Sequence, residues 1–225
     1  MKPRHVGIIP DGNRRWAKKA GISEYLAHST SGNYYNLSRI FNAARNEGVD
    51  TLSIWAFSTE NWQRSKREIN EILGVIERGI DNFIQSSQKD RYKFKVIGKR
   101  ECLPSRVVDK IEELEEMTGT YTGMQVVIGV DYGGRDELLR AINKAIAEGE
   151  PLDEEKFSKY LDTAGIPDPD LIIRTGGERR LSGYMPFQST YSEVVFSDIL
   201  FPDFTPENLV EAIKEFEDRK RRFGF

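Results

Sequence analysis

The chain alternates between short apolar runs and longer segments in which apolar residues recur every three or four positions. The short runs are rich in β-branched residues and end at polar or glycine-containing turns, which is typical of buried strands. They predict five strands: Val6–Ile9, Thr51–Phe57, Phe94–Ile97, Gln125–Val130 and Leu171–Ile173. The longer segments predict six helices: Tyr35–Asn46, Ser65–Gln88, Pro104–Met117, Asp136–Glu148, Asp153–Leu161 and Pro206–Arg222.

Strands and helices follow one another along the whole chain. This order predicts an α/β fold with a mostly parallel central β-sheet flanked by helices. No internal repeat is present, and the segment from Asp162 to Pro169, with its two prolines, is a turn and not a linker. Residues 1–225 are therefore expected to form a single domain. In such folds, ligands bind beyond the carboxyl ends of the strands.

The overall composition excludes several classes of protein. Hydrophobic residues make up 38% and charged residues 31% of the chain, a globular balance. The net charge of -3 and a pI of about 5.6 predict no nucleic-acid partner, so any anionic ligand needs a local cluster of cations. One cysteine and two histidines are too few for a disulfide framework or a zinc cage. With no long apolar stretch and no signal-peptide core, a cytoplasmic location is expected.

Polar groups of three kinds follow the first predicted strand. Residues 11–16 read Asp-Gly-Asn-Arg-Arg-Trp and are expected to form a loop. A carboxylate such as Asp11 in this position can bind Mg²⁺, which prefers hard oxygen ligands and shares its shell with substrate phosphates. Gly12 would let the backbone approach a ligand. The alternative is that Asp-Gly-Asn forms an ordinary turn, for which these residues are equally suited.

The second predicted strand leads into residues 57–64, Phe-Ser-Thr-Glu-Asn-Trp-Gln-Arg. Core packing explains Phe57 and Trp62 but not the polar residues between them. The alternative is local: Ser58 or Thr59 caps a helix, and Ser65 with Glu68 forms a capping box for the long helix that follows.

The strand at 171–173 leads into Arg174 and then into Thr-Gly-Gly-Glu-Arg-Arg-Leu-Ser-Gly, residues 175–183. Arginine binds phosphate oxygens through two parallel hydrogen bonds, and glycines let backbone N–H groups join the contact. The alternative is an exposed charged loop, which an apolar strand ending on Arg174 disfavours. Further along, Glu193 stands beside another apolar run and by itself is an ordinary surface residue.

Together these segments resemble the cis-prenyltransferases, the undecaprenyl diphosphate synthase family. The matching motifs are Asp-Gly-Asn-x-Arg-Trp from Asp11, Phe-Ser-Thr-Glu-Asn-Trp-x-Arg from Phe57, Tyr-Gly-Gly-Arg at 132–135, Arg-Thr-Gly-Gly-Glu at 174–178 and the closing Arg-Arg-Phe-Gly. The resemblance covers nearly the whole chain. It implies a Mg²⁺-dependent enzyme that condenses isopentenyl diphosphate with an allylic prenyl diphosphate, giving a longer Z-configured polyprenyl diphosphate and releasing diphosphate.

The resemblance also implies roles for single residues. The implied catalytic residues are Asp11, Asn13 and Asn61, and the implied Mg²⁺ ligands are Asp11 and Glu193. The implied substrate-binding residues are Gly12, Arg14, Arg15, Trp16, His28, Phe57, Ser58, Thr59, Trp62, Arg64, Glu68, Arg174, Arg180, Ser182, Arg222 and Gly224. Within this set, Arg174, Arg180 and Ser182 match the family's isopentenyl site, and Phe57 and Trp62 match the hydrocarbon side.

By the same resemblance, the enzyme is expected to be a homodimer. Arg222 and Gly224 resemble the terminal element that completes the neighbouring subunit's isopentenyl site; the alternative is a solvated helix end. The product's hydrocarbon tail would bring the cytoplasmic enzyme into peripheral contact with a membrane.

Two positions depart from the family pattern. Glu24 stands where the family usually has an arginine that binds the allylic diphosphate, and Ala27 replaces the glycine that usually precedes His28. Arg14, at a place often filled by glycine, would restore positive charge. These departures leave two alternatives open, namely head-to-middle condensation of two allylic diphosphates and a non-catalytic partner subunit. The complete set of isopentenyl-binding residues argues against the first, and the Asp-Gly-Asn motif argues against the second.

Overall fold

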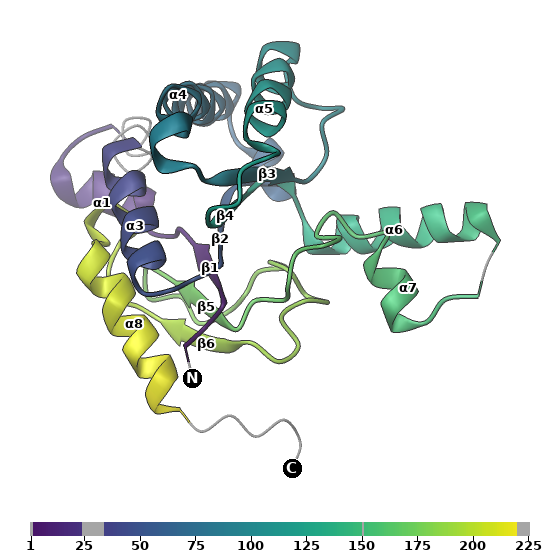
Figure 1. Cartoon of the computed structure of the whole chain (residues 1–225). Coiled ribbons are helices and arrows are strands. Elements are labelled where there is room, and N and C mark those ends of the chain that lie inside the picture. The colour runs from purple at the N-terminus through teal and green to yellow at the C-terminus, as the bar shows by residue number, and fades with distance from the viewer. Residues whose placement is uncertain (1, 24–33, 150, 220–225) are drawn as a thin grey trace.

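One six-stranded sheet runs through the molecule (Figure 1). The computed structural model describes residues 2–23, 34–149 and 151–219. The strand order is β3-β4-β2-β1-β5-β6, and every neighbouring pair is parallel. The strands are β1 (His5–Ile9), β2 (Thr51–Ser58), β3 (Lys93–Ile97), β4 (Gln125–Tyr132), β5 (Leu171–Arg174) and β6 (Glu193–Phe196). The predicted α/β class with a parallel sheet is confirmed.

Helices lie in the connections between most of the strands, as is usual for parallel pairing; the segment between β5 and β6 contains turns and no helix. The helices are α1 (Asn13–Ala20), α3 (Tyr34–Asn46), α4 (Lys66–Asp90), α5 (Ser105–Thr118), α6 (Gly134–Glu148), α7 (Glu154–Ser158) and α8 (Pro206–Asp218), with two short 3₁₀ helices, η1 (Thr59–Gln63) and η2 (Phe201–Asp203). Most predicted helices agree with these bounds within a few residues. The prediction of a loop at 11–16 was wrong, because helix α1 begins at Asn13. Strand β6 was not predicted.

The two faces of the sheet are covered differently. Alternate residues of each strand point to opposite faces, so that Leu171 and Ile173 pack in a large apolar core while Ile172 packs in a smaller one. The large core receives side chains from α3, α4, α5 and α8. The smaller core is completed by Tyr184 and Met185, which come from the segment after β5. No described helix is both long and apolar enough to cross a membrane.

Two irregularities interrupt the pairing of β2 with β4. Trp55 is level with Gly129 and Phe57 with Val130, so Ala56 is an extra residue on β2. Ser58 is level with Tyr132, so Asp131 is the extra residue on β4, and its φ is 49°. Such bulges re-aim the side chains that follow them. Here the first one turns Phe57 toward the large core, where it is fully buried.

Candidate active site

A cavity of about 860 Å³ lies at the carboxyl ends of β1, β2 and β5. Its polar end is formed by Asp11, Asn13, Arg14, Arg15, Arg174, Glu178, Arg180 and Ser182. Its apolar arm is formed by Leu37 and Phe41 of α3, by Ile72, Val75, Ile76, Gly79, Ile80 and Phe83 of α4, and by Ile54 and Ile128 of the sheet. One cavity thus joins a charged region to an apolar one.

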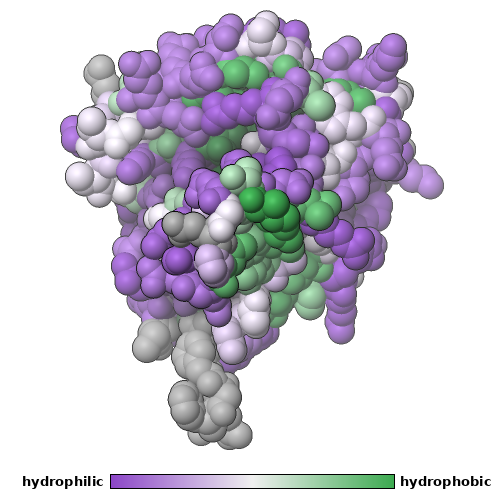
Figure 2. Space-filling view, turned by 90° about the vertical axis from the view of Figure 1, so that its right-hand side faces the viewer, coloured by the Kyte–Doolittle hydropathy of each residue, from purple (hydrophilic) through white to green (hydrophobic). Residues whose placement is uncertain are grey.

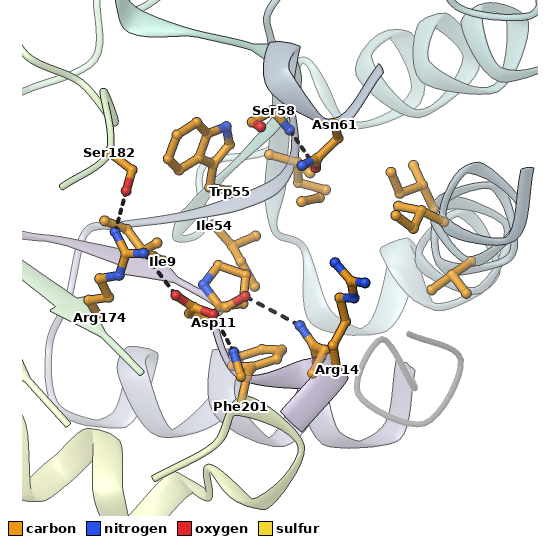
Figure 3. A pocket seen from close by; sticks show the side chains of 18 of the residues that line it. Ile9, Asp11, Arg14, Ile54, Trp55, Ser58, Asn61, Arg174, Ser182 and Phe201 are labelled. Atoms are coloured by element: carbon orange, nitrogen blue, oxygen red, sulfur yellow. Dashed lines mark hydrogen bonds and ion pairs between the residues drawn. The ribbon is translucent and has the colours of Figure 1, made fainter. Parts of the chain in front are cut away.

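Asp11 lies at the centre of the polar end (Figure 3). Its Oδ2 accepts a hydrogen bond from Arg174 Nη2 at 2.8 Å, and its Oδ1 lies 3.4 Å from Arg15 Nη2. Oδ1 also accepts from the backbone N–H of Gly12 at 2.6 Å. The Arg174 side chain is only 5% exposed, so its positive charge depends on this partner far more than an exposed cation would.

Arg174 and Glu178 extend this pairing into a network of charges. Arg174 Nη1 donates to Ser182 Oγ at 2.8 Å and to the Arg180 carbonyl oxygen at 2.5 Å. The Glu178 carboxylate lies 2.5 Å from Arg180 Nη1 and 3.8 Å from Arg15 Nη1. Arg15 and Arg180 remain at least half exposed and line the cavity. Two exposed guanidinium groups can therefore turn toward an anionic ligand without breaking buried contacts.

The ends of β1 and β5 are held together by backbone contacts. Thr175 Oγ1 accepts from Asp11 N and donates to Asp11 O, both at 2.8 Å. The next residue, Gly176, has φ +83°, and a Cβ there would lie 2.9 Å from the Asp11 carbonyl carbon. Only glycine permits this approach, so the Thr-Gly pair fixes Asp11 against Arg174.

Helix α1 starts directly after Asp11. Its N-cap, Gly12, has φ 103° and makes no side-chain cap hydrogen bond, so the positive end of the helix dipole is left available for an anion. Arg14 points from this end into the cavity, on the side of Asp11 opposite Arg174 and Ser182 (Figure 3). Trp16 Nε1 donates to Asp203 at 2.7 Å and fastens α1 to η2.

The segment after β2 combines local capping with a place in the cavity wall. Ser58 N donates to Asn61 Oδ1 at 3.0 Å, which is half of a capping box on η1. Ser65 Oγ accepts from Glu68 N at 3.3 Å at the start of α4, and Arg64 pairs with the buried Glu68 at 2.8 Å. Ser58, Asn61 and Arg64 also line the cavity. The local alternative for these residues is therefore true and does not exclude a functional one.

Comparison with known proteins identifies the family. Residues 9–224 match the model of a family described as putative undecaprenyl diphosphate synthase. The chain belongs to the undecaprenyl diphosphate synthase family. An isoprenyl transferase from Treponema denticola is 40% identical over 98% of this chain and 97% of its own length, and one from Chlamydia pneumoniae is 42% identical over 99% and 92%.

Solved structures from the family agree closely with this fold. Lavandulyl diphosphate synthase from Lavandula x intermedia, in complex with dimethylallyl diphosphate, has a TM-score of 0.95 at 34% identity and covers 100% of this chain and 99% of its own. A probable undecaprenyl diphosphate synthase from Campylobacter jejuni has a TM-score of 0.85 at 32% identity, covering 100% of both chains. The expected prenyltransferase activity is thus confirmed at the level of the family.

The structure brings most of the predicted site residues of this prenyltransferase to one cavity. They are Asp11, Gly12, Asn13, Arg14, Arg15, Ser58, Asn61, Arg64, Arg174, Arg180 and Ser182. His28, Arg222 and Gly224, together with Glu24, lie outside the described residues. The apolar arm on α4 was missed, because its periodic pattern is the same as that of an ordinary core helix. Lys18 was missed because α1 was not predicted.

Five predicted residues support the cavity from behind and do not line it. Trp16 and Glu68 make the contacts given above. Thr59 packs on Gly133, where an added Cβ would lie 2.3 Å from its Oγ1. Phe57 is fully buried and meets Trp62 edge to face at 5.0 Å, so neither ring lies on the hydrocarbon side as expected.

Glu193 lies at the opposite edge of the sheet from Asp11. Glu193 is the first residue of β6. In the register of the sheet it pairs with Leu171 of β5, which in turn pairs with Val6 of β1. Asp11 follows Val6 by five residues in the direction of β1, which is about 16 Å at the rise per residue of a strand. Glu193 instead accepts a hydrogen bond from Arg219 Nη1 at 2.9 Å. A metal ion bound by Asp11 therefore cannot use Glu193 of the same chain.

The residues around Asp11 fit a magnesium ion that shares its shell with a substrate. No cluster of three or more acidic, histidine or cysteine ligands occurs among the described residues. The Asn13 side-chain oxygen is buried beside Asp11, and no hydrogen-bond partner for it is found there. One carboxylate, one amide oxygen and the phosphates of a ligand are the donor set that Mg²⁺ accepts when no all-protein cage exists.

Proposed function

We propose that this chain condenses isopentenyl diphosphate with an allylic prenyl diphosphate in the cavity described above, with Mg²⁺ as cofactor. The observation that carries the proposal is the joining of a cationic region to an apolar arm in one cavity. The substrate of such a reaction has a diphosphate at one end and a hydrocarbon tail at the other. The cavity matches both parts in the order in which the substrate presents them.

The two diphosphates are assigned to opposite sides of Asp11. Isopentenyl diphosphate binds on the side of Arg174, Arg180 and Ser182, where the guanidinium of Arg180 is exposed. The allylic diphosphate binds at the start of α1, where the helix dipole and Arg14 supply positive charge. Its tail then enters the apolar arm.

The reaction breaks the bond between the allylic carbon and its diphosphate oxygen and forms a new carbon–carbon bond to isopentenyl diphosphate. The cationic condensation product then loses a proton, which the released diphosphate accepts. Negative charge grows on the departing diphosphate, and the arginines and the positive end of α1 stabilise it. Mg²⁺, when bound through Asp11, Asn13 and the diphosphate, supplies Lewis acidity at the same oxygens. The apolar arm excludes water from the allylic carbon.

Head-to-middle condensation is not favoured, because the related proteins named above that are about 40% identical to this chain are isoprenyl transferases. Incubation of the purified chain with isopentenyl diphosphate, allylic primers of several lengths and Mg²⁺, followed by mass spectrometry, tests the proposal. We expect products that grow by five-carbon steps, and none in the presence of EDTA. Products formed from allylic primer alone would instead establish the head-to-middle reaction.

We also propose that the enzyme works as a homodimer. Helix α6 extends away from the sheet (Figure 1) and exposes three large apolar side chains on one stripe. Leu139 is 62% exposed, Ile142 40% and Ile146 70%. Figure 2, which views the molecule from the side toward which α6 extends, shows an apolar patch on this face. A stripe of this kind on a projecting helix suits a second copy of the chain.

A further inference from the structure

The junction between β4 and α6 (residues 131–134) adjoins two segments that form polar parts of the cavity wall. β2 and β4 are parallel neighbours, and Ser58 is level with Tyr132, so η1 begins beside the end of β4. The segment after β5 reaches the same place, because the backbone N–H of Gly134 donates to the carbonyl oxygen of Gly183 at 3.0 Å. Both segments contribute side chains to the cavity wall, whereas residues 131–134 do not line it. The junction therefore contacts both segments without belonging to the cavity wall.

Gly133 leaves room for η1. Its φ of -143° and ψ of 125° are extended values that any residue adopts, so the backbone conformation does not require glycine here. A Cβ built at this position would lie 2.3 Å from Thr59 Oγ1 and 3.1 Å from Thr59 Cγ2, so the close approach of Thr59 requires glycine. Thr59 is the first residue of η1, which also carries Asn61. The contact therefore fixes how closely η1 can approach the end of β4.

Gly134 leaves room for the segment that carries Ser182. An added Cβ would lie 2.0 Å from Pro186 Cδ and 2.5 Å from the carbonyl oxygen of Gly183. A proline ring and a backbone carbonyl cannot rotate away, so a residue with a side chain would displace the segment. Ser182 has φ 54°, a left-handed conformation that is unfavourable for serine and persists only where surrounding contacts hold it. Its hydroxyl accepts a hydrogen bond from Arg174, so a displacement would reach the buried arginine.

Trp55 fixes the junction between the two segments. Its Nε1 donates to the carbonyl oxygen of Tyr132 at 3.0 Å, and Tyr132 is fully buried. The Trp55 ring lies against that of Tyr184, with centroids 5.3 Å apart. In the view of Figure 3, Trp55 lies between Ser182 and Asn61. The junction is therefore part of a packed core, and each of the two segments must adjust to it.

We infer that the β4–α6 junction positions both segments, with Gly133 setting the place of η1 and Gly134 the place of the segment around Ser182. Both glycines act through the residues that they contact, and neither touches a substrate. Ser182 belongs to the isopentenyl side of the cavity, so Gly134 governs the binding of isopentenyl diphosphate. Asn61 of η1 is expected to act in catalysis, so Gly133 governs the rate of condensation. The inference rests on the proposed chain-elongating reaction.

Single alanine variants test the two assignments. We expect Gly134→Ala to raise the KM for isopentenyl diphosphate at least about tenfold, while the KM for the allylic substrate stays within about threefold. Gly133→Ala should lower kcat at least about tenfold, with both KM values within about threefold. Gly74→Ala adds the same methyl on α4, outside the cavity wall, and should keep all three constants. Steady-state rates with each substrate varied in turn measure these constants; partial unfolding would lower the apparent kcat but leave both KM values unchanged.

A second substitution separates positioning from a general loss of structure. Thr59→Ala leaves only its Cβ, 3.3 Å from the methyl added at Gly133. Gly133→Ala should therefore lower kcat by less than about threefold when Thr59→Ala is already present. Pro186→Ala should give Gly134→Ala no such relief, because the carbonyl oxygen of Gly183 remains 2.5 Å from the added methyl.

An unchanged KM for isopentenyl diphosphate in a folded Gly134→Ala variant would overturn the inference, and so would an equal cost of Gly133→Ala with and without Thr59→Ala. If Gly134→Ala does not fold, Pro186→Ala must still raise this KM at least about threefold, since the segment then loses its contact with Gly134. If Gly133→Ala does not fold, the variant that combines it with Thr59→Ala must fold. A parent protein that consumes no isopentenyl diphosphate would refute the proposed function itself, which is a different outcome from an active parent whose glycine variants behave as it does.

Discussion

At the scale of single residues, Asp11 connects several members of the polar end. It pairs with Arg174 and Arg15, accepts from Gly12 and is clamped by Thr175. Its carboxylate is 30% exposed, so it faces both the buried arginine and the cavity. The same group therefore positions Arg174 and presents oxygen to a metal ion.

The first prediction concerns this carboxylate. Asp11→Asn keeps the shape and an acceptor for Arg174 but removes the charge that a metal ion requires. We expect kcat to fall by roughly a thousandfold or more, as when a principal electrostatic group is removed from an active site. Steady-state rates at saturating Mg²⁺ measure the loss, and circular dichroism checks the fold. Near-parental turnover would show that Asp11 does not serve the metal.

His5 is a second residue whose environment has measurable consequences. Its Nδ1 lies 2.6 Å from the Pro167 carbonyl oxygen, which can only accept, so Nδ1 carries the proton. Nε2, 2.7 Å from Ser53 Oγ, then accepts from that hydroxyl, which in turn accepts from Tyr184 at 2.8 Å. Burial lowers the pKa of His5 from 6.5 to about 4, outweighing the backbone hydrogen bond to Pro167, which raises it.

The second prediction is a pH dependence of stability. Because the pKa of His5 is lower in the folded state, the unfolded chain binds the proton first, and stability falls as the pH drops from 6.5 toward 4. Between pH 7 and pH 5.5 the loss should be about 1 kcal/mol. Urea unfolding at both pH values measures it. His5→Gln should remove this drop and His28→Gln should keep it; the reverse result would contradict the assignment.

At the scale of elements, a hydrogen bond from Trp62 fastens η1 to the sheet. Trp62 Nε1 donates to Asp131 Oδ1 at 2.8 Å, and Asp131 is fully buried in the bulge on β4. Burial raises the pKa of Asp131, against the opposing effect of the Trp62 N–H. This contact holds the segment that carries Ser58 and Asn61 over the cavity.

The third prediction is that Trp62→Phe loosens η1. The ring still packs on Phe57, but Asp131 loses its donor, which should cost about 1–3 kcal/mol of unfolding free energy. We expect the KM for the substrates to rise as well, because Asn61 is less well positioned. Asp131→Asn is the control: it keeps an acceptor for Trp62, so its stability should fall less than that of Trp62→Phe. Equal KM values in parent and Trp62→Phe would remove η1 from substrate binding.

At the scale of the whole molecule, assembly depends on the exposed stripe of α6. The fourth prediction is that Ile146→Glu weakens the dimer, since it places a charge in an apolar interface. We expect the dissociation constant to rise at least about tenfold, or 1.4 kcal/mol. Sedimentation of parent and variant measures it. Lys144→Glu, exposed on the opposite side of the same helix, should leave the dimer intact. A monomeric parent would refute the dimer.

The fifth prediction tests whether the two sites are shared between subunits. If Arg222 completes the partner's isopentenyl site, a mixture of inactive Arg222→Ala and Arg174→Ala dimers should regain activity. Each mixed dimer has one site with both lesions and one with neither, so roughly a quarter of parental activity is expected after full exchange. Activity after subunit exchange measures it. No recovery, with exchange verified by mass spectrometry, would mean that Arg222 acts only within its own chain.

The sequence alone determined the order of most strands and helices and the motifs at the strand ends. Apolar periodicity and β-branched runs are local properties, so β1 to β5 and most helices could be predicted from them. The motif containing Asp11 and the one containing Arg174 are separated by more than 150 residues, yet parallel pairing of β1 with β5 necessarily places both at one edge of the sheet. Strand β6 was missed because a partly buried edge strand of four residues carries little periodic signal.

Only the tertiary structure decided which side chains face the cavity. Local sequence does not reveal the bulge at Ala56, which depends on pairing with β4 and turns Phe57 into the core. Nor does it distinguish a helix that packs on a sheet from one that leaves a gap, because both require the same apolar stripe. The apolar arm lies between α3, α4 and the sheet, where residues distant in the sequence leave a space that they do not fill. A cavity forms where elements that are far apart in the chain do not pack fully against one another, so it cannot be predicted from the sequence of any single segment.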